Sequence, residues 1–169
     1  MNTTNLHHYF DNITKIDELK KAYKAWAMKL HPDRGGTDEE FRAMAEEYHR
    51  KLKTATYDDG NTIKEERVQK ETAEAEKFKE IIDKLLNLDG INVELCGSWL
   101  WIDGNTKIHK DALKAWGCRW APKKKKWYWC PPEQHKNRYR GKKTMDEIRM
   151  KYGSTKFKKD DEDNRKITA

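Results

Sequence analysis

The sequence predicts an α+β fold, with helices in its first half and a small sheet in its second. Up to about residue 88, apolar residues recur at three- and four-residue steps, which is typical of amphipathic helices. From residue 91 they alternate with polar residues, and six of the seven tryptophans lie between Trp99 and Trp129. The expected parts are a helical domain, 1–56, a linker and charged connecting helix, 57–90, a basic ββαββ domain, 91–153, and a disordered tail, 154–169.

The first helix is predicted over residues 16–30. Thr14 can serve as its N-cap, with Asp17 three residues later completing a capping box. Pro32 ends the helix, because the residue before a proline is pushed out of the α region. One apolar stripe runs along the helix, made of Ile16, Leu19, Ala22, Tyr23, Trp26, Ala27 and Leu30.

A second helix follows the glycine pair Gly35-Gly36, which permits a reversal of the chain. Asp38 is the expected cap. The facing apolar stripe consists of Phe41, Met44, Ala45, Tyr48 and Leu52. Two antiparallel helices with such stripes bury each other. The tripeptide His31-Pro32-Asp33 is then expected to lie exposed at the tip of the hairpin.

The stretch KKAYKAWAMKLHPDR, residues 20–34, resembles the J-domain of DnaJ-type co-chaperones, and the resemblance covers residues 9–53. The following Gly-Gly is similar to the compact J-domains of viral tumour antigens and mitochondrial import motors. The resemblance implies docking on a DnaK-type heat-shock chaperone and stimulation of that partner's ATPase. It assigns the trigger, which stimulates ATP hydrolysis by the partner, to His31, Pro32 and Asp33. It assigns the docking face to Lys20, Tyr23 and Lys24.

Residues 63–88 are predicted to form a charged helix that ends at Asp89-Gly90. Apolar positions are sparse in its first half, so this half is expected to be an exposed connector with pairs such as Glu66–Lys70. The denser stripe of the second half, from Phe78 to Leu88, is expected to pack on the C-terminal domain. A dimerising coiled coil is the alternative, although few heptads carry apolar residues at both core positions.

The C-terminal domain is predicted from strand alternation and turn signals. Strands are expected over 91–95, 99–102, 118–121 and 127–129, with Asp103-Gly104 as a turn. A helix capped by Asn105 or Thr106 is expected to run to Trp116, with inward-facing residues Ile108, Ala112, Leu113 and Trp116. A last helix should begin at Thr144, where Glu147 completes a capping box.

The positive charge of the chain is concentrated in residues 91–153, where 15 Lys and Arg face 6 Asp and Glu. Alternation places Tyr128 opposite Trp127 and Trp129, so one face is expected to be core and the other free. Stacking on unpaired bases and contact with phosphate would suit a single-stranded nucleic acid, and an acidic protein is the alternative partner. The candidate binding residues are Arg119, Lys123, Lys124, Lys125, Lys126, Tyr128, Arg138 and Arg140.

The segment from Lys110 to Tyr128 is similar to small modules of phage and plasmid proteins, so a phage or mobile-element origin is expected. The three cysteines fit a reducing, cytoplasmic location better than a disulfide framework. They are expected to be buried, and their spacing lacks the close pairs of common zinc modules. The alternative metal site would consist of Cys96, Cys118, Cys130 and His135.

No phosphate-binding loop or nucleophile motif occurs in the sequence, so neither an enzyme nor a cofactor is expected. No apolar run is long enough for a membrane span. The chain is therefore interpreted as a J-domain co-chaperone that recruits a DnaK-type chaperone to a target of its C-terminal domain. A single-stranded nucleic-acid-binding module with an accessory J-domain is the alternative.

Overall fold

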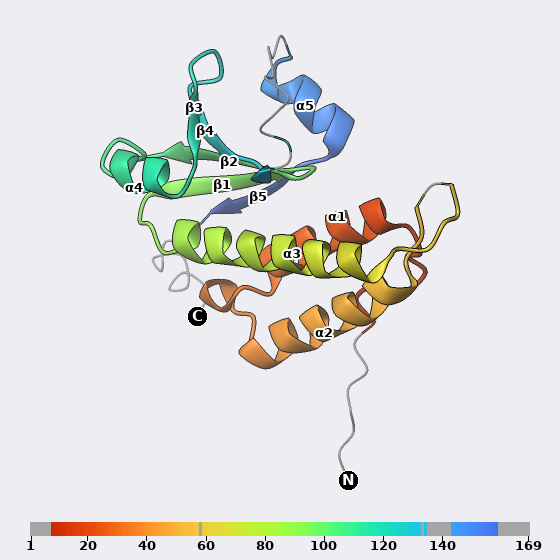
Figure 1. Cartoon of the computed structure of the whole chain (residues 1–169). Helices are drawn as coiled ribbons and strands as arrows, with labels where there is room; N and C mark the ends of the chain where they lie inside the picture. Colours follow the sequence, from red (N-terminus) through yellow and green to blue (C-terminus); the bar gives the residue numbers. More distant parts are fainter. Residues whose placement is uncertain (1–7, 58, 133, 135–142, 159–169) are drawn as a thin grey trace, which may run out of the picture. The chain divides into compact units, whose positions relative to one another are not determined.

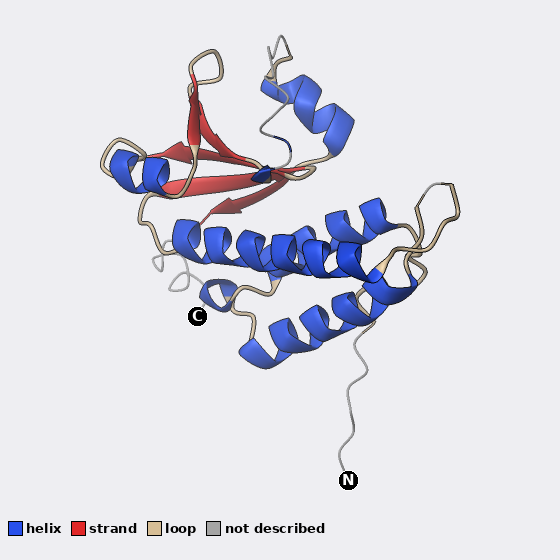
Figure 2. Ribbon diagram, in the orientation of Figure 1, coloured by secondary structure: helices blue, strands red, loops and turns tan. Residues whose placement is uncertain are grey.

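The computed structural model describes residues 8–57, 59–132, 134 and 143–158, and it confirms the α+β class (Figure 2). Helices make up the first part of the chain and an antiparallel sheet the second. The chain divides into two compact units, residues 1–83 (unit 1) and 84–169 (unit 2). Among the described residues, no helix is both long enough and apolar enough to cross a membrane.

Unit 1 is built from three helices and a short 3₁₀ turn (Figure 1). The elements are α1 (Ile16–Lys29), η1 (Pro32–Arg34), α2 (Asp38–Thr54) and α3 (Glu65–Leu86), which belongs to this unit up to Asp83. The predicted stripes meet in its core. Its fully or almost fully buried side chains include Leu19, Ala27, Met28, Met44, Tyr48, Leu52, Phe78 and Ile82.

A buried carboxylate fixes the segment before α1. Glu47 of α2 is only 6% exposed and accepts hydrogen bonds from the backbone N–H groups of Tyr9 and Phe10, both at 3.0 Å. The indole Nε1–H of Trp26 in α1 donates to the Tyr9 carbonyl at 3.1 Å. Because its two carboxylate oxygens accept from two backbone donors, the buried Glu47 holds this segment in place.

Both predicted N-caps of the first hairpin are wrong by one residue. Helix α1 begins after Lys15, which makes no side-chain cap, because the chain ahead of it is held by backbone bonding between Thr14 and Thr56. Helix α2 is capped by Thr37, and Glu40 completes the capping box, so Asp38 becomes the first helical residue. The helices themselves are confirmed.

The prediction that the first half of α3 is an exposed connector is wrong. Val68, Glu71 and Ala75 are buried at helical spacing, and they continue into Phe78 and Ile82. The sparse apolar residues are sufficient because the remaining position on this face, Glu71, is neutralised by cations. Helix α3 is therefore a full member of the core of unit 1.

Unit 2 is a five-stranded antiparallel sheet with the strand order β3-β4-β2-β1-β5. Its strands are β1 (Ile91–Cys96), β2 (Trp99–Gly104), β3 (Arg119–Ala121), β4 (Lys126–Trp129) and β5 (Thr155–Lys158). Its helices are α4 (Lys110–Ala115) and α5 (Met145–Tyr152). The predicted ββαββ order and the Thr144–Glu147 capping box of the last helix are confirmed.

Two expectations for unit 2 are corrected. Strand β5 lies at the start of the expected disordered tail, where backbone pairing with β1 orders a short and mostly polar segment. Residues 159–169 of that tail lie outside the described part of the chain. Helix α4 begins only at Lys110, so Ile108 precedes it and is 69% exposed instead of facing inward.

The two faces of the sheet carry different chemistry. Leu100 and Ile102 of β2 lie opposite Trp129 and Trp127 of β4, and all four are buried. On the other face, Ile148 of α5 packs in a cluster with Cys96 and Trp101. Alternation along each strand thus produces two separate small cores.

An ion pair joins α5 to β1 on this second face. Arg149 contacts both carboxylate oxygens of Glu94 in β1, with Nε at 2.6 Å and Nη2 at 2.9 Å, and Ser154 donates to the same carboxylate. These hydrogen bonds lower the pKa of Glu94 to about 2 although burial opposes the shift. The carboxylate therefore stays charged at neutral pH and holds α5 in place.

Candidate functional site

The His31-Pro32-Asp33 turn has a defined conformation. His31 caps η1, and its Nδ1 accepts a hydrogen bond from the Asp33 backbone N–H at 3.2 Å. Gly35 ends η1 with a left-handed φ of 86°. A Cβ on Gly36 would lie 2.2 Å from the Leu30 carbonyl oxygen, so only glycine permits this close approach. The glycine pair thus returns the chain from α1 into α2 and sets the position of the turn.

The turn is not fully exposed, which corrects the sequence-based expectation. Pro32 and Asp33 face solvent, but His31 is only 4% exposed. Its Nε2 lies 2.6 Å from Oδ1 of Asp83 in α3. Because Nδ1 accepts from a backbone N–H, the ring proton resides on Nε2 and is donated to Asp83. The burial arises because α3 passes over this end of α1.

The other three residues assigned to docking lie along α1 and also contact α3. Lys20 Nζ is 2.5 Å from Glu71 and 3.1 Å from Glu74. The Tyr23 hydroxyl donates to the Ala75 carbonyl at 3.4 Å. Tyr23 and Lys24 are buried, and only Lys20 is partly exposed. The structure therefore brings Lys20, Tyr23, Lys24 and His31 to one face of α1, which we call the α1 face.

The pKa values of the two lysines shift in opposite directions. Burial lowers the pKa of Lys24 to about 8, with repulsion from Lys20 as the next cause, and its Nζ lies over the Phe78 ring, 5.5 Å from the centroid. Burial also acts to lower the pKa of Lys20, but the hydrogen bonds with Glu71 and Glu74 raise it above its usual value. Lys20 is thus held as a cation, whereas Lys24 loses part of its positive charge near neutral pH.

The residues of α3 that contact the α1 face were missed by sequence reasoning. Glu71 and Glu74 were assigned to an exposed connector, in which a carboxylate usually faces water, and Asp83 was assigned to the half of the helix expected to pack on the C-terminal domain. Glu71, Glu74, Ala75 and Phe78 follow one side of a helix at three- and four-residue steps, and this spacing was the available signal for the first two carboxylates. The signal was ambiguous because other carboxylates, such as the exposed Glu76, lie between them.

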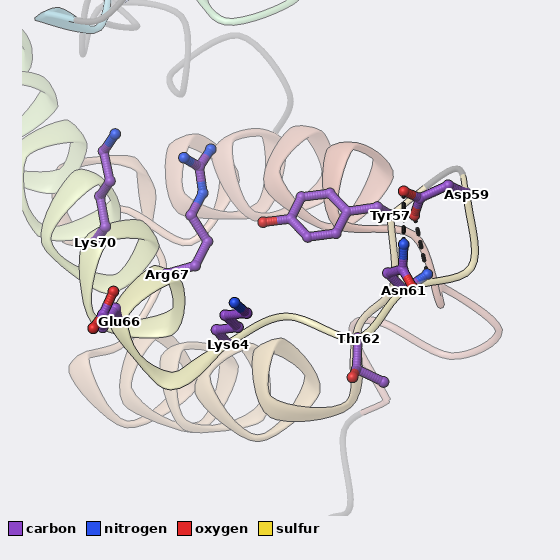
Figure 3. A pocket seen from close by; sticks show the side chains of 8 residues that line it. All are labelled: Tyr57, Asp59, Asn61, Thr62, Lys64, Glu66, Arg67 and Lys70. Carbon is purple, nitrogen blue, oxygen red and sulfur yellow. Dashed lines mark hydrogen bonds between the residues drawn. The ribbon is translucent and has the colours of Figure 1, made fainter.

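Unit 1 also has an open hollow of about 710 Å³ beside the start of α3, shown in Figure 3. Its lining residues come from the loop after α2 and from the first turns of α3: Tyr57, Asp59, Asn61, Thr62, Lys64, Glu66, Arg67 and Lys70. Asp59 accepts hydrogen bonds from the backbone and the side chain of Asn61, which stabilises the loop. None of the residues assigned to docking lines this hollow.

In unit 2, Tyr128 belongs to an aromatic cluster on the face of the sheet that α5 covers. Tyr128 is paired with Trp101 on one side and Arg119 on the other. Its ring stacks on Trp99, with centroids 5.2 Å apart and an angle of 17°. Trp101 is 3% exposed, whereas Tyr128 and Trp99 are half-buried. The predicted placement of Tyr128 opposite Trp127 is confirmed, but its face is only partly free.

The lysine run forms the turn between β3 and β4, and its members differ in their surroundings. Lys123 and Lys125 are exposed. Lys124 packs with its Nζ 5.6 Å from the Trp101 ring centroid, and burial lowers its pKa. Lys126 forms an ion pair with Asp103 of β2. Two of the four lysines, together with the exposed Arg119, are thus directly available to a partner.

The three cysteines are buried, as expected of small hydrophobic residues, and none of them forms a disulfide. Burial raises the pKa of Cys96 to about 11 and that of Cys118 to about 12, so neither is a ready thiolate at neutral pH. Within the described residues no group of three or more potential ligands could hold a metal ion. His135, Arg138 and Arg140 lie outside the described residues.

The comparisons with known proteins provide no family assignment. Neither the family models nor the curated proteins nor the solved structures matched this chain. A functional interpretation therefore depends on the residues of the two surfaces and on their chemistry.

Proposed function

We propose that this chain is a J-domain co-chaperone that docks on a DnaK-type heat-shock chaperone, stimulates its ATPase, and brings it to a target of unit 2. The observation that carries the proposal is the order of residues along α1. The last residue of the α1 face is His31. The next residues, Pro32 and Asp33, are exposed in a turn whose path is fixed by two glycines. This arrangement presents a trigger next to a basic helix.

The packing of the helical hairpin supports the same proposal. The resemblance covers residues 9–53, and within this range α1 and α2 pack through the residues expected to be core. Glu47 holds the preceding segment in place, so the docking helix is rigid at its start. A rigid helix and turn lower the entropy lost on docking.

Docking is tested by measuring the affinity of the full chain for a DnaK-type chaperone at several salt concentrations. Affinity should fall with salt, because exposed opposite charges are screened over about 10 Å at 0.1 M. Lys24 is buried in the free chain. An ion pair that it forms with the partner on docking contributes about 0.2–1 kcal/mol, so Lys24→Ala should weaken binding by up to about fivefold. Lys20→Ala is less informative because Lys20 also pairs with Glu71 and Glu74.

Lys21→Ala is the matched control, since Lys21 lies on α1 but faces solvent away from these contacts. Equal effects of Lys24→Ala and Lys21→Ala would show that only the overall charge matters. Binding that does not change with salt would place the contact on an apolar surface and contradict docking through the α1 face.

A second function, binding of single-stranded nucleic acid by unit 2, is favoured by two features. Lys123 and Lys125 are exposed in the β3–β4 turn, and the exposed Arg119 is paired with the half-buried Tyr128 across the strands. Replacing Lys123 and Lys125 with glutamine should reduce affinity for an oligonucleotide and flatten its salt dependence. The slope of log affinity against log salt should fall in magnitude by up to about 1.4, because each neutralised phosphate contributes about 0.7 on a single strand.

The control for this variant replaces Lys107 and Lys110, which are exposed in the same unit outside the β3–β4 turn. If the control lowers affinity equally, binding reflects net charge alone. If the full chain shows no binding at low salt, the basic turn is better interpreted as a protein-docking surface.

A further inference from the structure

The α1 face is covered by α3 over its whole length. Contacts occur at three successive levels: Lys20 with Glu71 and Glu74, Lys24 with Phe78, and His31 with Asp83. Glu71, Glu74 and Phe78 follow one another at three- and four-residue steps and so share one side of the helix, and Asp83 extends the contact to His31 beyond the C-terminal end of α1. The segment 71–83, called the α3 cover below, thus occupies the surface on which a chaperone would have to dock.

The α3 cover complements the α1 face in charge. It places carboxylates against Lys20 and against the imidazole of His31. Glu71 is fully buried, and its second oxygen lies 2.7 Å from Nε of Arg67. Because a buried carboxylate is costly without cations, this pairing holds the cover on α1. An acidic partner surface would make the same kind of contact with Lys20.

Apolar contacts hold the cover as well. Phe78 and Ile82 are fully buried, and Ala75 is nearly so. Release of the cover therefore exposes apolar surface at a cost of about 25 cal/mol per Å². The closed form is stable on its own, and a docking partner has to offset this cost.

We propose that the α3 cover is an internal competitor of the chaperone, so that docking requires residues 71–83 to leave the α1 face. This inference rests on the proposed function. Its consequence is that the apparent affinity equals the intrinsic affinity multiplied by the open fraction. For a minor open state of about 0.1–10%, full release of the cover raises the apparent affinity by about tenfold to a thousandfold.

The release variant carries Glu71→Gln, Glu74→Gln and Asp83→Asn in the full chain. The matched control carries Glu65→Gln, Glu76→Gln and Glu80→Gln, which remove the same charge from the exposed side of α3. A first readout requires no chaperone: an amine-reactive label is applied, and labelling of Lys24 is measured by mass spectrometry relative to the exposed Lys21. Lys24 should react slowly in the wild type and the control, and close to the Lys21 rate in the release variant.

The second readout is affinity for a DnaK-type chaperone. The release variant should bind at least about tenfold more tightly than the wild type, and the control should bind as the wild type does. Lys24 labelled at the Lys21 rate in the wild type would overturn the inference. So would faster labelling in the release variant with no gain in affinity over a wild type that binds.

If neither the wild type nor the release variant binds the chaperone, the proposed function and the competition are both wrong. The labelling of Lys24 then reports only whether residues 71–83 cover the α1 face. Since Glu71 is fully buried, the triple change could loosen unit 1, and Asp83→Asn alone is the second variant. It removes the negative charge opposite His31, while the amide oxygen still accepts the His31 hydrogen bond, and it leaves the pairs of Lys20 intact. It should raise affinity by a smaller factor with an unchanged urea transition, and an unchanged affinity would count against the inference.

Discussion

Asp33→Asn should abolish stimulation of a DnaK-type ATPase by this chain while unit 1 remains folded. Asp33 is exposed, and the bond that shapes the turn comes from its backbone N–H to His31, which asparagine retains. Exposed substitutions of this kind change stability by no more than about 0.5 kcal/mol. A loss of stimulation therefore reports the missing carboxylate of the trigger.

The measurement is the single-turnover ATP hydrolysis rate of the chaperone with increasing amounts of each protein. Asp38→Asn, which alters an exposed carboxylate at the start of α2, should stimulate as the wild type does. His31→Gln should also abolish stimulation, but it breaks the contact with Asp83 as well, so Asp33→Asn isolates the trigger. Full stimulation by Asp33→Asn would remove the J-domain interpretation.

Trp127→Ala should have the largest effect on stability, with a loss of about 3–5 kcal/mol, as is typical of a large aromatic residue removed from a core. Trp127 is 7% exposed and lies between Ile102 of β2 and Trp120 of β3. The cavity left in a small sheet cannot collapse easily. Unit 2 should therefore unfold at much lower urea concentration, as followed by far-UV circular dichroism of the full chain.

Tyr128→Ala is the matched comparison, because it alters the next residue of the same strand. Tyr128 is half-buried and stacks on Trp99, so its loss should cost less, with about 0.5–1.5 kcal/mol from the aromatic pair in addition to the area lost. Unit 2 should stay folded. Equal losses for the two variants would contradict the assignment of Trp127 to the main core of the sheet.

Much of the fold follows from short-range patterns. The three- and four-residue spacing of apolar residues such as Ile16, Leu19 and Tyr23 predicted the helices of the hairpin. Strand alternation placed Tyr128 and Trp127 on opposite faces. Such patterns report which side of an element is apolar. They do not report which distant element covers a polar side.

The elements that escaped prediction are held by long-range pairing. The contacts of Lys20 with Glu71 and of His31 with Asp83 join polar residues about fifty positions apart, and isolated polar side chains are usually solvated. Strand β5 is ordered by backbone pairing with β1 although its sequence is mostly polar. For the same reason the sequence identified the α1 face but not its cover.

Nuclear magnetic resonance shows residue by residue whether the chain docks through the α1 face and the adjoining turn. A DnaK-type chaperone is added to the isotope-labelled full chain, and the change of each backbone amide signal is recorded. We expect the amide signals of Lys20 to Asp33 and of the α3 cover to broaden or shift, with little change at Lys123 to Tyr128. Changes confined to the β3–β4 turn, with α1 unaffected, would contradict docking through the α1 face.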